Sequence, residues 1–236
     1  MDVSDRKAAL VLFSAGQDSS VCLAWALARY TRVESIGFDY GQAHAVELAQ
    51  RPLLREAIAA LRPEWRARLG PDRLVDMRAF ASLAPSTLTG AAPSPNAPAG
   101  LPATFVPGRN LAFLAYAGAH ASVRGLGALV GGMCETDFAG YPDCRREAID
   151  AMEAALRLGL DPRLSIETPL MRLTKAQTWA LAEELGGAPL VETILELSHT
   201  CYRGVRALRH AWGYGCGECA ACQLRAAGYA EWRGGS

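Results

Sequence analysis

The chain has 236 residues, half of them hydrophobic, and its 24 basic side chains balance 24 acidic ones. This length suits one α/β domain, or one domain with a small appendage, and a net charge of zero argues against a nucleic-acid or membrane footprint. The first 30 residues lack the order of a signal peptide, and no apolar run is long enough to span a bilayer, so we expect a cytoplasmic protein in a reducing compartment.

The first eighty residues alternate between predicted strands and predicted helices. Strands are expected at 9–14, at 33–41 with a polar loop at the end, and at 73–80 with the exit from the strand included; helices are expected at 18–30 and 45–61. The first strand, ALVLFS, is apolar almost throughout, as in strands that are buried on both faces. This β-α-β-α-β order predicts an α/β fold with a central parallel sheet, right-handed crossovers and helices on both faces.

The second half begins with an irregular stretch. Residues 85–103 are rich in Pro, Gly, Ala, Ser and Thr, which we interpret as a lid or a surface excursion, and a plain disordered loop fits the composition equally well. Thr174 is a candidate N-cap residue. The remaining elements are expected as helices at about 109–124, 144–158 and 174–185, and as strands at about 127–132 and 164–170.

A small polar turn, LFSAGQDSS at 12–20, joins the first strand to the first helix. Free N–H groups at a helix N-terminus, together with the helix dipole, favour an anion there. Gly16 lets the backbone approach a ligand, Ser14 and Ser19 offer hydroxyl groups, and Asp18 is suited to hold magnesium or to cap the helix. Neither the Walker loop nor the dinucleotide fingerprint matches. Taken alone, an ordinary capped turn explains the loop equally well.

Four of the seven cysteines lie in the tail, at Cys201, Cys216, Cys219 and Cys222. The last three are spaced C-x-x-C-x-x-C, and such short spacing lets one turn aim two thiolates at one metal ion. We predict that the four cysteines hold a structural zinc ion in a knuckle within residues 197–228. An iron–sulfur cluster is the alternative. His199 is a candidate competing ligand or a group that supports a ligand.

The stretch SAGQDS also resembles the pyrophosphate loop of the N-type ATP pyrophosphatases, which reads Ser-Gly-Gly-x-Asp-Ser. Those enzymes cleave ATP between the α and β phosphates and adenylate an oxygen of the substrate. Ala15 stands where the family has glycine. If this residue needs a positive φ, alanine costs about 1–2 kcal/mol, whereas a need for small size alone costs little. The resemblance implies that ATP, with Mg²⁺, is bound by Phe13, Ser14, Ala15, Gly16, Gln17, Asp18, Ser19 and Ser20.

Four further stretches fit a single family. They are FDYGQAHAVEL (38–48), TFVPGRNLAFL (104–114), GMCETDFAGYPDCRREAI (132–149) and IETPLMRLTKAQTWALA (166–182). Together with the loop and the cysteine tail, they closely resemble the 7-cyano-7-deazaguanine synthases of queuosine biosynthesis. The resemblance covers about residues 8–228 in order.

The resemblance implies a fold and an activity. The fold is a single ATP pyrophosphatase-type domain over residues 1–236, similar to the adenine nucleotide alpha hydrolases. The family converts 7-carboxy-7-deazaguanine, ATP and ammonia to the nitrile 7-cyano-7-deazaguanine (preQ0), through an adenylated carboxylate, an amide and a second adenylation. It binds one Zn²⁺ per subunit and forms homodimers. No nucleic acid or membrane partner is implied.

The residue chemistry agrees with this reaction. Adenylation requires ATP phosphates held in line with their charge neutralised, for which Asp18, Arg109 and Lys175 are the candidate catalytic residues. A carboxylate complements the N–H and amino edge of a deazaguanine, and an aromatic ring such as Phe138 or Tyr141 is suited to stack on its face. The non-functional alternatives are an acidic surface loop for the substrate-binding segment and a solvated residue for Lys175. The candidate substrate-binding residues are Asp39, Tyr40, Gln42, Arg109, Asn110, Glu135, Asp137, Tyr141, Asp143 and Arg145.

Three departures from the family pattern concern Ala15, Ala43 and the length of one segment. Ala43 falls where the family often has arginine, and the segment between Cys201 and Cys216 is longer than usual, which predicts a longer loop before the knuckle. The rival enzyme function is another ATP pyrophosphatase, one that modifies tRNA bases or amidates another carboxylate. Zero net charge argues against a large RNA footprint. A non-catalytic zinc module is the rival from a different class, and the phosphate loop argues against it.

Overall fold

The computed structural model describes residues 7–92, 100–135 and 141–235. The elements in chain order are β1 (Ala8–Leu12), α1 (Gln17–Arg29), β2 (Arg32–Asp39), α2 (Val46–Ala60), α3 (Pro63–Arg68), β3 (Leu69–Asp76), α4 (Ala79–Leu83), the 3₁₀ turn η2 (Thr87–Thr89), α5 (Arg109–Arg124), β4 (Ala128–Val130), the 3₁₀ turn η3 (Pro142–Cys144), α6 (Arg146–Gly159), β5 (Ser165–Glu167), α7 (Lys175–Leu197), β6 (Arg209–His210), β7 (Gly213–Tyr214) and α8 (Ala220–Gly234). Within these described ranges, no helix is both long and apolar enough to cross a bilayer.

The central sheet has five strands in the order β3-β2-β1-β4-β5, and every neighbouring pair is parallel. The chain therefore moves outward from β1 to β3 and then returns to the other side of β1 with β4. That reversal creates a switch point between β1 and β4, where loops at the carboxyl ends of the strands diverge and leave room for a ligand. The predicted parallel sheet is confirmed.

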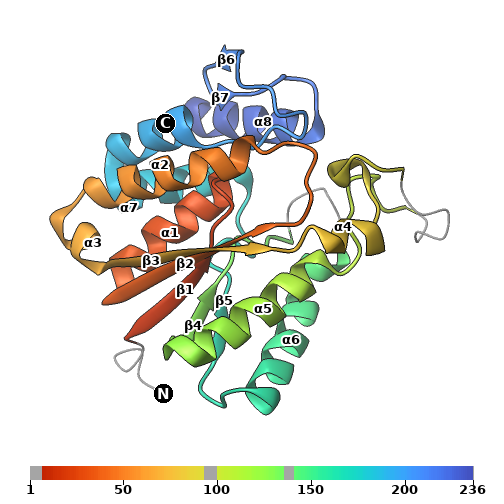
Figure 1. The fold of residues 1–236 in the computed structure, drawn as a ribbon. Coiled ribbons are helices and arrows are strands. Elements are labelled where there is room, and N and C mark those ends of the chain that lie inside the picture. Colours follow the sequence, from red (N-terminus) through yellow and green to blue (C-terminus); the bar gives the residue numbers. More distant parts are fainter. Residues whose placement is uncertain (1–6, 93–99, 136–140, 236) are drawn as a thin grey trace.

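Helices cover both faces of this sheet, as predicted (Figure 1). The alternation of side chains along β1 explains how. Ala9 and Val11 pack in one core cluster with residues of α1 and α7, whereas Ala8 and Leu10 pack in a second cluster with residues of α5 and α6. Apolar residues at successive positions of β1 thus build two cores, one in each helical layer.

Strand β3 begins four residues earlier in the chain than the sequence predicts. It begins at Leu69 and ends at Asp76, and it follows the unpredicted helix α3, which starts with Pro63 and buries Trp65. Gly70 and Pro71 disguise the start of the strand because both residues are poor strand formers. Proline is accommodated here because β3 is an edge strand of the sheet.

Helix α7 begins where predicted and continues beyond its predicted end. Thr174 caps it, because the hydroxyl accepts from the Gln177 N–H at 3.2 Å and the Gln177 side chain accepts from the Thr174 N–H at 2.9 Å. Non-helical backbone at Gly187 kinks the element, and Pro189 follows it. The glycine ends one helix, and the proline opens the next one directly, so the expected stop at 185 is a kink.

The excursion at 85–103 is anchored on both sides where the structure describes it. Ser86 and Thr89 form a capping box in η2, and the Thr87 N–H donates to the Ala103 carbonyl at 3.1 Å. The Leu88 carbonyl accepts from the Ala43 N–H at 2.8 Å. These bonds tie the described start of the excursion to the loop after β2, so a plain disordered loop does not describe residues 86–91.

Candidate active site

A cavity of about 330 Å³ lies at the carboxyl ends of β1, β2 and β4. The loops that follow these strands contribute Ser14, Tyr40 and Cys134, the start of α5 contributes Arg109, and the start of α7 contributes Lys175. Four segments far apart in the sequence therefore converge on this one cavity at the switch point, since residues from each of 14–19, 38–42, 109–110 and 141–144 line it.

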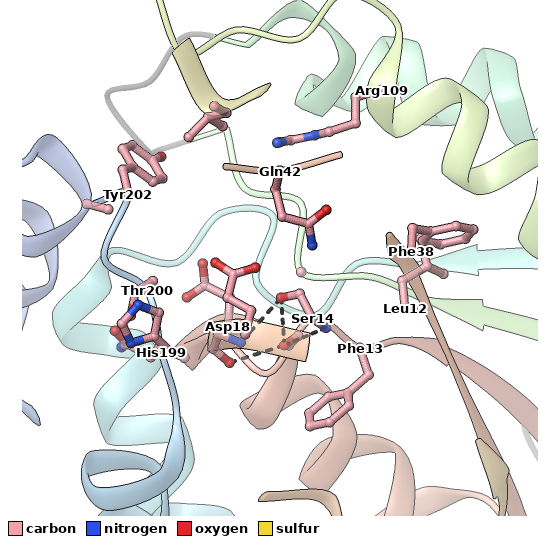
Figure 2. A pocket seen from close by; sticks show the side chains of 18 of the residues that line it. Leu12, Phe13, Ser14, Asp18, Phe38, Gln42, Arg109, His199, Thr200 and Tyr202 are labelled. Atoms are coloured by element: carbon pink, nitrogen blue, oxygen red, sulfur yellow. Dashed lines mark hydrogen bonds between the residues drawn. The ribbon is translucent and has the colours of Figure 1, made fainter. Parts of the chain in front are cut away.

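The loop after β1 wraps around the N-terminus of α1 (Figure 2). The Ser19 hydroxyl donates to the Gly16 carbonyl at 3.1 Å and accepts from the Ser14 N–H at 3.2 Å, while the Ser14 hydroxyl accepts from the Gly16 N–H at 3.3 Å. Ser20 donates to the same Gly16 carbonyl at 2.7 Å. The hydroxyl groups thus fix the shape of the loop, and the free end of the α1 dipole faces the cavity, which suits a phosphate group.

Ala15 adopts a left-handed backbone conformation with φ of +70°. The structure describes no other non-glycine residue with a positive φ. Of the two sequence-based alternatives, the strained one is therefore correct, and it costs about 1–2 kcal/mol. The Ala15 carbonyl accepts from the His199 N–H at 2.9 Å, so a segment far along the chain helps to hold the strained residue.

Asp18 and Lys175 form an ion pair across the cavity wall. The Lys175 ammonium lies 2.6 Å from Asp18 Oδ2, and the two side chains are only 11% and 25% exposed. The first turns of α1 and α7 are thereby joined. Helix α8 packs against the Lys175 turn at Gly228, where a Cβ atom would lie 2.3 Å from Lys175 Cβ. The pair places a positive charge and a carboxylate beside the phosphate loop.

Arg109, Tyr40 and Glu47 form the opposite side of the cavity. The Arg109 guanidinium donates to the Tyr40 hydroxyl at 3.4 Å and lies 5.5 Å from the centre of its ring. Burial raises the pKa of Glu47 to about 7, although the positive charge of Arg109 opposes that shift. Figure 2 shows Arg109 and Gln42 above Asp18 and Ser14, across the open space.

The acidic loop that includes Glu135 and Asp143 contributes fewer side chains to the cavity than the sequence predicts. Asp143 is buried, and its carboxylate accepts from the Asn110 N–H at 3.0 Å at the start of α5. Glu135 accepts from the Arg146 N–H, and Arg145 is exposed. Neither Glu135, Asp143 nor Arg145 lines the cavity. Asp137 and Phe138 lie outside the described residues.

The other predicted substrate-binding residues divide into two groups. Tyr40, Gln42, Arg109, Asn110 and Tyr141 line the cavity. Asp39 does not line it, because its carboxylate accepts from the Gly41 N–H at 3.2 Å in the turn after β2. Ala15 and Ser20 of the predicted ATP-binding set also lie behind the cavity surface, where they support the loop.

The four tail cysteines come together as predicted. Their sulfur atoms lie within 4.8 Å of one another, and no other group of at least three potential metal-binding side chains occurs among the described residues. Cys216 and Cys222 are 3.9 Å apart at sulfur, close to the roughly 3.8 Å that tetrahedral Zn–S bonds of about 2.3 Å imply. The set therefore fits a structural zinc ion. His199 does not belong to it.

Within the cysteine cluster the surroundings favour a thiolate at Cys216, whereas burial raises the pKa of Cys219 and Cys222. Burial raises the pKa of Cys216, but the N–H groups of Cys219 and Glu218 donate to its sulfur and bring the pKa down to about 6. The long segment between Cys201 and Cys216 is not a plain loop, since it contains the antiparallel pair β6 and β7. The ring of His210 stacks on Trp212 there, with centroids 4.5 Å apart.

Sequence reasoning did not place Glu47, His199 or Thr200 at this site. His199 is fully buried, lines the cavity and has no hydrogen-bond partner for either ring nitrogen within the described part of the chain. Burial lowers the pKa of its imidazole to about 4, so the ring is neutral. Two sequence clues were available. His199 lies two residues before Cys201, a predicted zinc ligand, and Glu47 follows the loop after β2.

The family model of the queuosine biosynthesis protein QueC matches residues 8–233. The 7-cyano-7-deazaguanine synthase of Caulobacter vibrioides (strain NA1000 / CB15N) is 61% identical over 232 residues, which cover 98% of this chain and 96% of that protein. The synthase of Maricaulis maris (strain MCS10) is 60% identical and covers 96% of this chain and 93% of its own length.

A solved structure of a 4-thiouridine synthetase–RNA complex with bound ATP shares the fold. Its TM-score is 0.51 at 16% sequence identity, and the match covers 78% of this chain and 42% of that chain. At that identity the likeness concerns the fold alone. The family model and the relatives at 60% identity, both spanning nearly the whole chain, show that this chain belongs to the queuosine biosynthesis protein QueC family.

Proposed function

We propose that this chain converts 7-carboxy-7-deazaguanine, ATP and ammonia into 7-cyano-7-deazaguanine. The observation that carries the proposal is the phosphate loop with the Asp18–Lys175 pair in one wall of a cavity, in a chain of this family. The enzyme is then an ATP-dependent carbon–nitrogen ligase. The names of the relatives support the same reaction.

The chemistry requires two activations. A carboxylate oxygen is a poor leaving group toward ammonia until it is adenylated, and ammonia then displaces AMP to give the amide. Adenylation of the amide oxygen allows it to leave in turn, and loss of the N–H protons gives the nitrile. The two oxygen atoms of the carboxylate therefore leave on the phosphates of two AMP molecules. Each ATP is cleaved between its α and β phosphates and also releases pyrophosphate.

The residues of the cavity divide this work. Ser14, Gly16 and Ser19 shape the end of α1 for the pyrophosphate, and Lys175 neutralises charge that develops on the phosphates. Asp18 is the candidate ligand for the Mg²⁺ that accompanies ATP. Asp18 and Lys175 already lie paired beside the phosphate loop, which organises this part of the site before ATP binds.

The base is assigned to the side of the cavity that holds Tyr40, Gln42, Arg109 and Tyr141. Arg109 suits the substrate carboxylate, and Tyr40 or Tyr141 suits the face of the ring. Asp143 and Glu135, which were expected to read the N–H edge, make hydrogen bonds to backbone groups of this chain. Asp18 and Glu47 are the carboxylates that line the described cavity, so Glu47 becomes the candidate for that edge.

Zinc, ammonia and a second subunit complete the proposal. The four cysteines would hold the zinc ion with every coordination position filled by the protein, so its contribution is structural. Ammonia enters as the nucleophile toward the adenylated carboxylate. A homodimer is the assembly that the family resemblance implies, and sedimentation of the purified protein measures it.

The function is tested by phosphorus NMR of the nucleotides together with mass spectrometry of the base. We expect AMP and pyrophosphate, two ATP consumed per nitrile, and the amide as an intermediate. The Asp18→Asn variant should lower kcat by about 100-fold or more for both steps, because one loop serves both adenylations. Asp150→Asn, on the exposed face of α6, is the matched control. ADP and phosphate as the main products would contradict the mechanism.

A further inference from the structure

Arg225 is a buried cation whose bonds are all made to neutral groups. It lies in α8, three residues after Cys222, and is 1% exposed. Its Nε donates to the Trp212 carbonyl at 2.9 Å, and another nitrogen donates to the Ile194 carbonyl at 3.3 Å. Among the described residues no carboxylate accepts a hydrogen bond from Arg225, although the charge of Asp18 acts on it, so the neutral acceptors must hold this buried cation in place.

The third nitrogen of the guanidinium holds a short segment that we call the strap, Ser198–Cys201. It donates to the Ser198 hydroxyl at 2.8 Å and to the Thr200 hydroxyl at 2.6 Å. The strap follows the end of α7, and Ser198 and His199 in it are fully buried. One planar side chain therefore fixes two side chains of an otherwise irregular segment, which the fork geometry of arginine allows.

The strap in turn holds the phosphate loop. The His199 N–H donates to the carbonyl of the strained residue Ala15 at 2.9 Å. The next residue of the loop, Gly16, faces the strap so closely that a Cβ atom there would lie 3.7 Å from the His199 carbonyl oxygen and 3.9 Å from Thr200 Cγ2. Figure 2 shows His199 and Thr200 beside Asp18 at the end of α1. The loop that receives the phosphates thus rests on the strap.

The strap ends at Cys201, one of the four clustered cysteines. Arg225 therefore holds the strap at Ser198 and Thr200, and the cysteine cluster includes its last residue. Gly213 preserves this arrangement, because a Cβ atom there would lie 2.7 Å from an Arg225 nitrogen. Burial lowers the pKa of Arg225 to about 10, so the side chain keeps its charge at neutral pH and all its donors remain available.

We propose that Arg225 is a positioning residue for ATP use, which fixes the strap and through it the phosphate loop. The proposal rests on the function assigned above. Arg225 borders the cavity but is only 1% exposed, and its hydrogen bonds are with Ile194, Ser198, Thr200 and Trp212, so it acts through the strap. Its loss should raise the KM for ATP and loosen the loop while the zinc content stays the same.

The test compares three variants with the wild type in zinc content, in hydrogen exchange of peptides covering 12–20 and 196–201, and in kinetics with ATP varied. Arg225→Met removes both charge and fork, Arg225→Lys keeps the charge alone, and Ser198→Ala removes one strap contact at a residue outside the cavity. Arg55→Met is the matched control, since Arg55 is also buried and bonds Ser35 in a different part of the molecule.

We expect one zinc per chain throughout. Arg225→Met should raise the KM for ATP about tenfold, Arg225→Lys and Ser198→Ala should raise it several-fold, and both peptides should exchange faster in all three variants. Arg55→Met should leave the KM and both peptides unchanged. If Arg225→Met does not fold, Ser198→Ala decides the question.

Wild-type exchange and KM values in Arg225→Met and Ser198→Ala would overturn the proposal. A wild-type KM for ATP and wild-type exchange in Arg225→Lys would overturn the proposal too, because a positive charge alone would then be enough to hold the strap. A wild-type protein that makes no nitrile would contradict the proposed function instead. Hydrogen exchange of the loop and strap peptides would still test whether Arg225 holds the loop through the strap, because that measurement needs no substrate.

Discussion

At the scale of single residues, the backbone of Ala15 decides between two sequence-based alternatives. The sequence shows a small residue where the related loops have glycine, but residue type alone does not report φ. The structure gives +70°, so the residue is strained and is held by the strap. Strain of this kind persists where surrounding contacts determine the conformation, and here it coincides with the phosphate loop.

Two substitutions of Ala15 should separate strain from space. Glycine relieves about 1–2 kcal/mol of left-handed strain but gives up a buried methyl group and adds unfolded-state entropy, each worth about 0.5–1 kcal/mol. Ala15→Gly should therefore change the free energy of unfolding by less than about 1 kcal/mol and keep ATP use. Ala15→Val should lower it by more than about 2 kcal/mol, because Ala15 is fully buried and valine tolerates positive φ poorly. Denaturant unfolding measures both changes, and a stable Ala15→Val variant would contradict the argument.

Residue type also proved an incomplete guide to which charges serve the ligand. The sequence places Glu135 and Asp143 in a loop near the site, but it does not reveal that both carboxylates bond backbone N–H groups. Conversely, Glu47 looks like part of an ordinary amphipathic helix until the fold turns it toward the cavity. Whether a carboxylate is used by the fold or by a ligand depends on tertiary contacts, which local patterns do not encode.

At the scale of elements, periodic segments were predicted well and irregular ones were not. Helix α5 has the predicted bounds of 109–124, because its apolar periodicity is strong and a glycine lies on each side. The pair β6–β7 was missed, since two-residue strands carry no periodicity, and β3 was displaced by Gly70 and Pro71. These segments become regular through tertiary contacts, such as the edge position of β3 in the sheet and the pairing of β6 with β7, which local sequence patterns do not report.

The N-cap of α7 gives a prediction at this scale. Thr174→Ala removes the capping box and should lower the free energy of unfolding by about 1 kcal/mol. It should also lower kcat, because the first turn of α7 carries Lys175. Thr193→Ala, in the same helix, is the matched control, since its hydroxyl donates to the Pro189 carbonyl and caps no helix end among the described residues. Equal stability losses in the two variants, measured by denaturant unfolding, would argue against a special role of the cap.

The cysteine cluster gives a second prediction about an element. Cys219→Ala should release the zinc ion, because three thiolates leave the tetrahedral site open and weak. Since the strap ends at Cys201, the loss should also increase hydrogen exchange in peptides covering 196–201 and 12–20. Elemental analysis and exchange on the same samples test both steps. The matched control is Cys22→Ala, in the core of α1 and outside the cluster, and it should keep the metal.

At the scale of the whole molecule, the site follows from topology. The β-α-β-α-β order of the first half predicts the parallel sheet, and the return of the chain to β4 beside β1 puts the switch point at the phosphate loop. The sequence therefore locates the cavity, while its inner surface depends on segments that meet only in the folded chain. The strap reaches Ala15 from residue 199, and Lys175 reaches Asp18 from a distant helix.

The cavity also links the stability of the whole molecule to pH through Glu47. Its pKa is about 7 in the folded chain, against about 4.3 in an unfolded one. Between these values the folded chain binds more protons than the unfolded chain, so this group's contribution is complete below about pH 4.3 and is lost as the pH rises through about 7. Burial beside Arg109 causes the shift, so the effect belongs to the cavity as assembled from α2 and α5.

Glu47→Gln should therefore flatten the dependence of the free energy of unfolding on pH between about pH 4.3 and 7, with the variant gaining stability relative to the wild type as the pH rises. Denaturant unfolding at several pH values measures the slope, and Glu183→Gln, at an exposed glutamate of α7, is the matched control for losing a carboxylate. If Glu47 also reads the N–H edge of the base, the same variant should raise the KM for the carboxylate substrate more than the KM for ATP. An unchanged pH slope would show that Glu47 ionises as freely in the folded chain as in the unfolded one, and an unchanged KM would remove it from the base-binding side of the cavity.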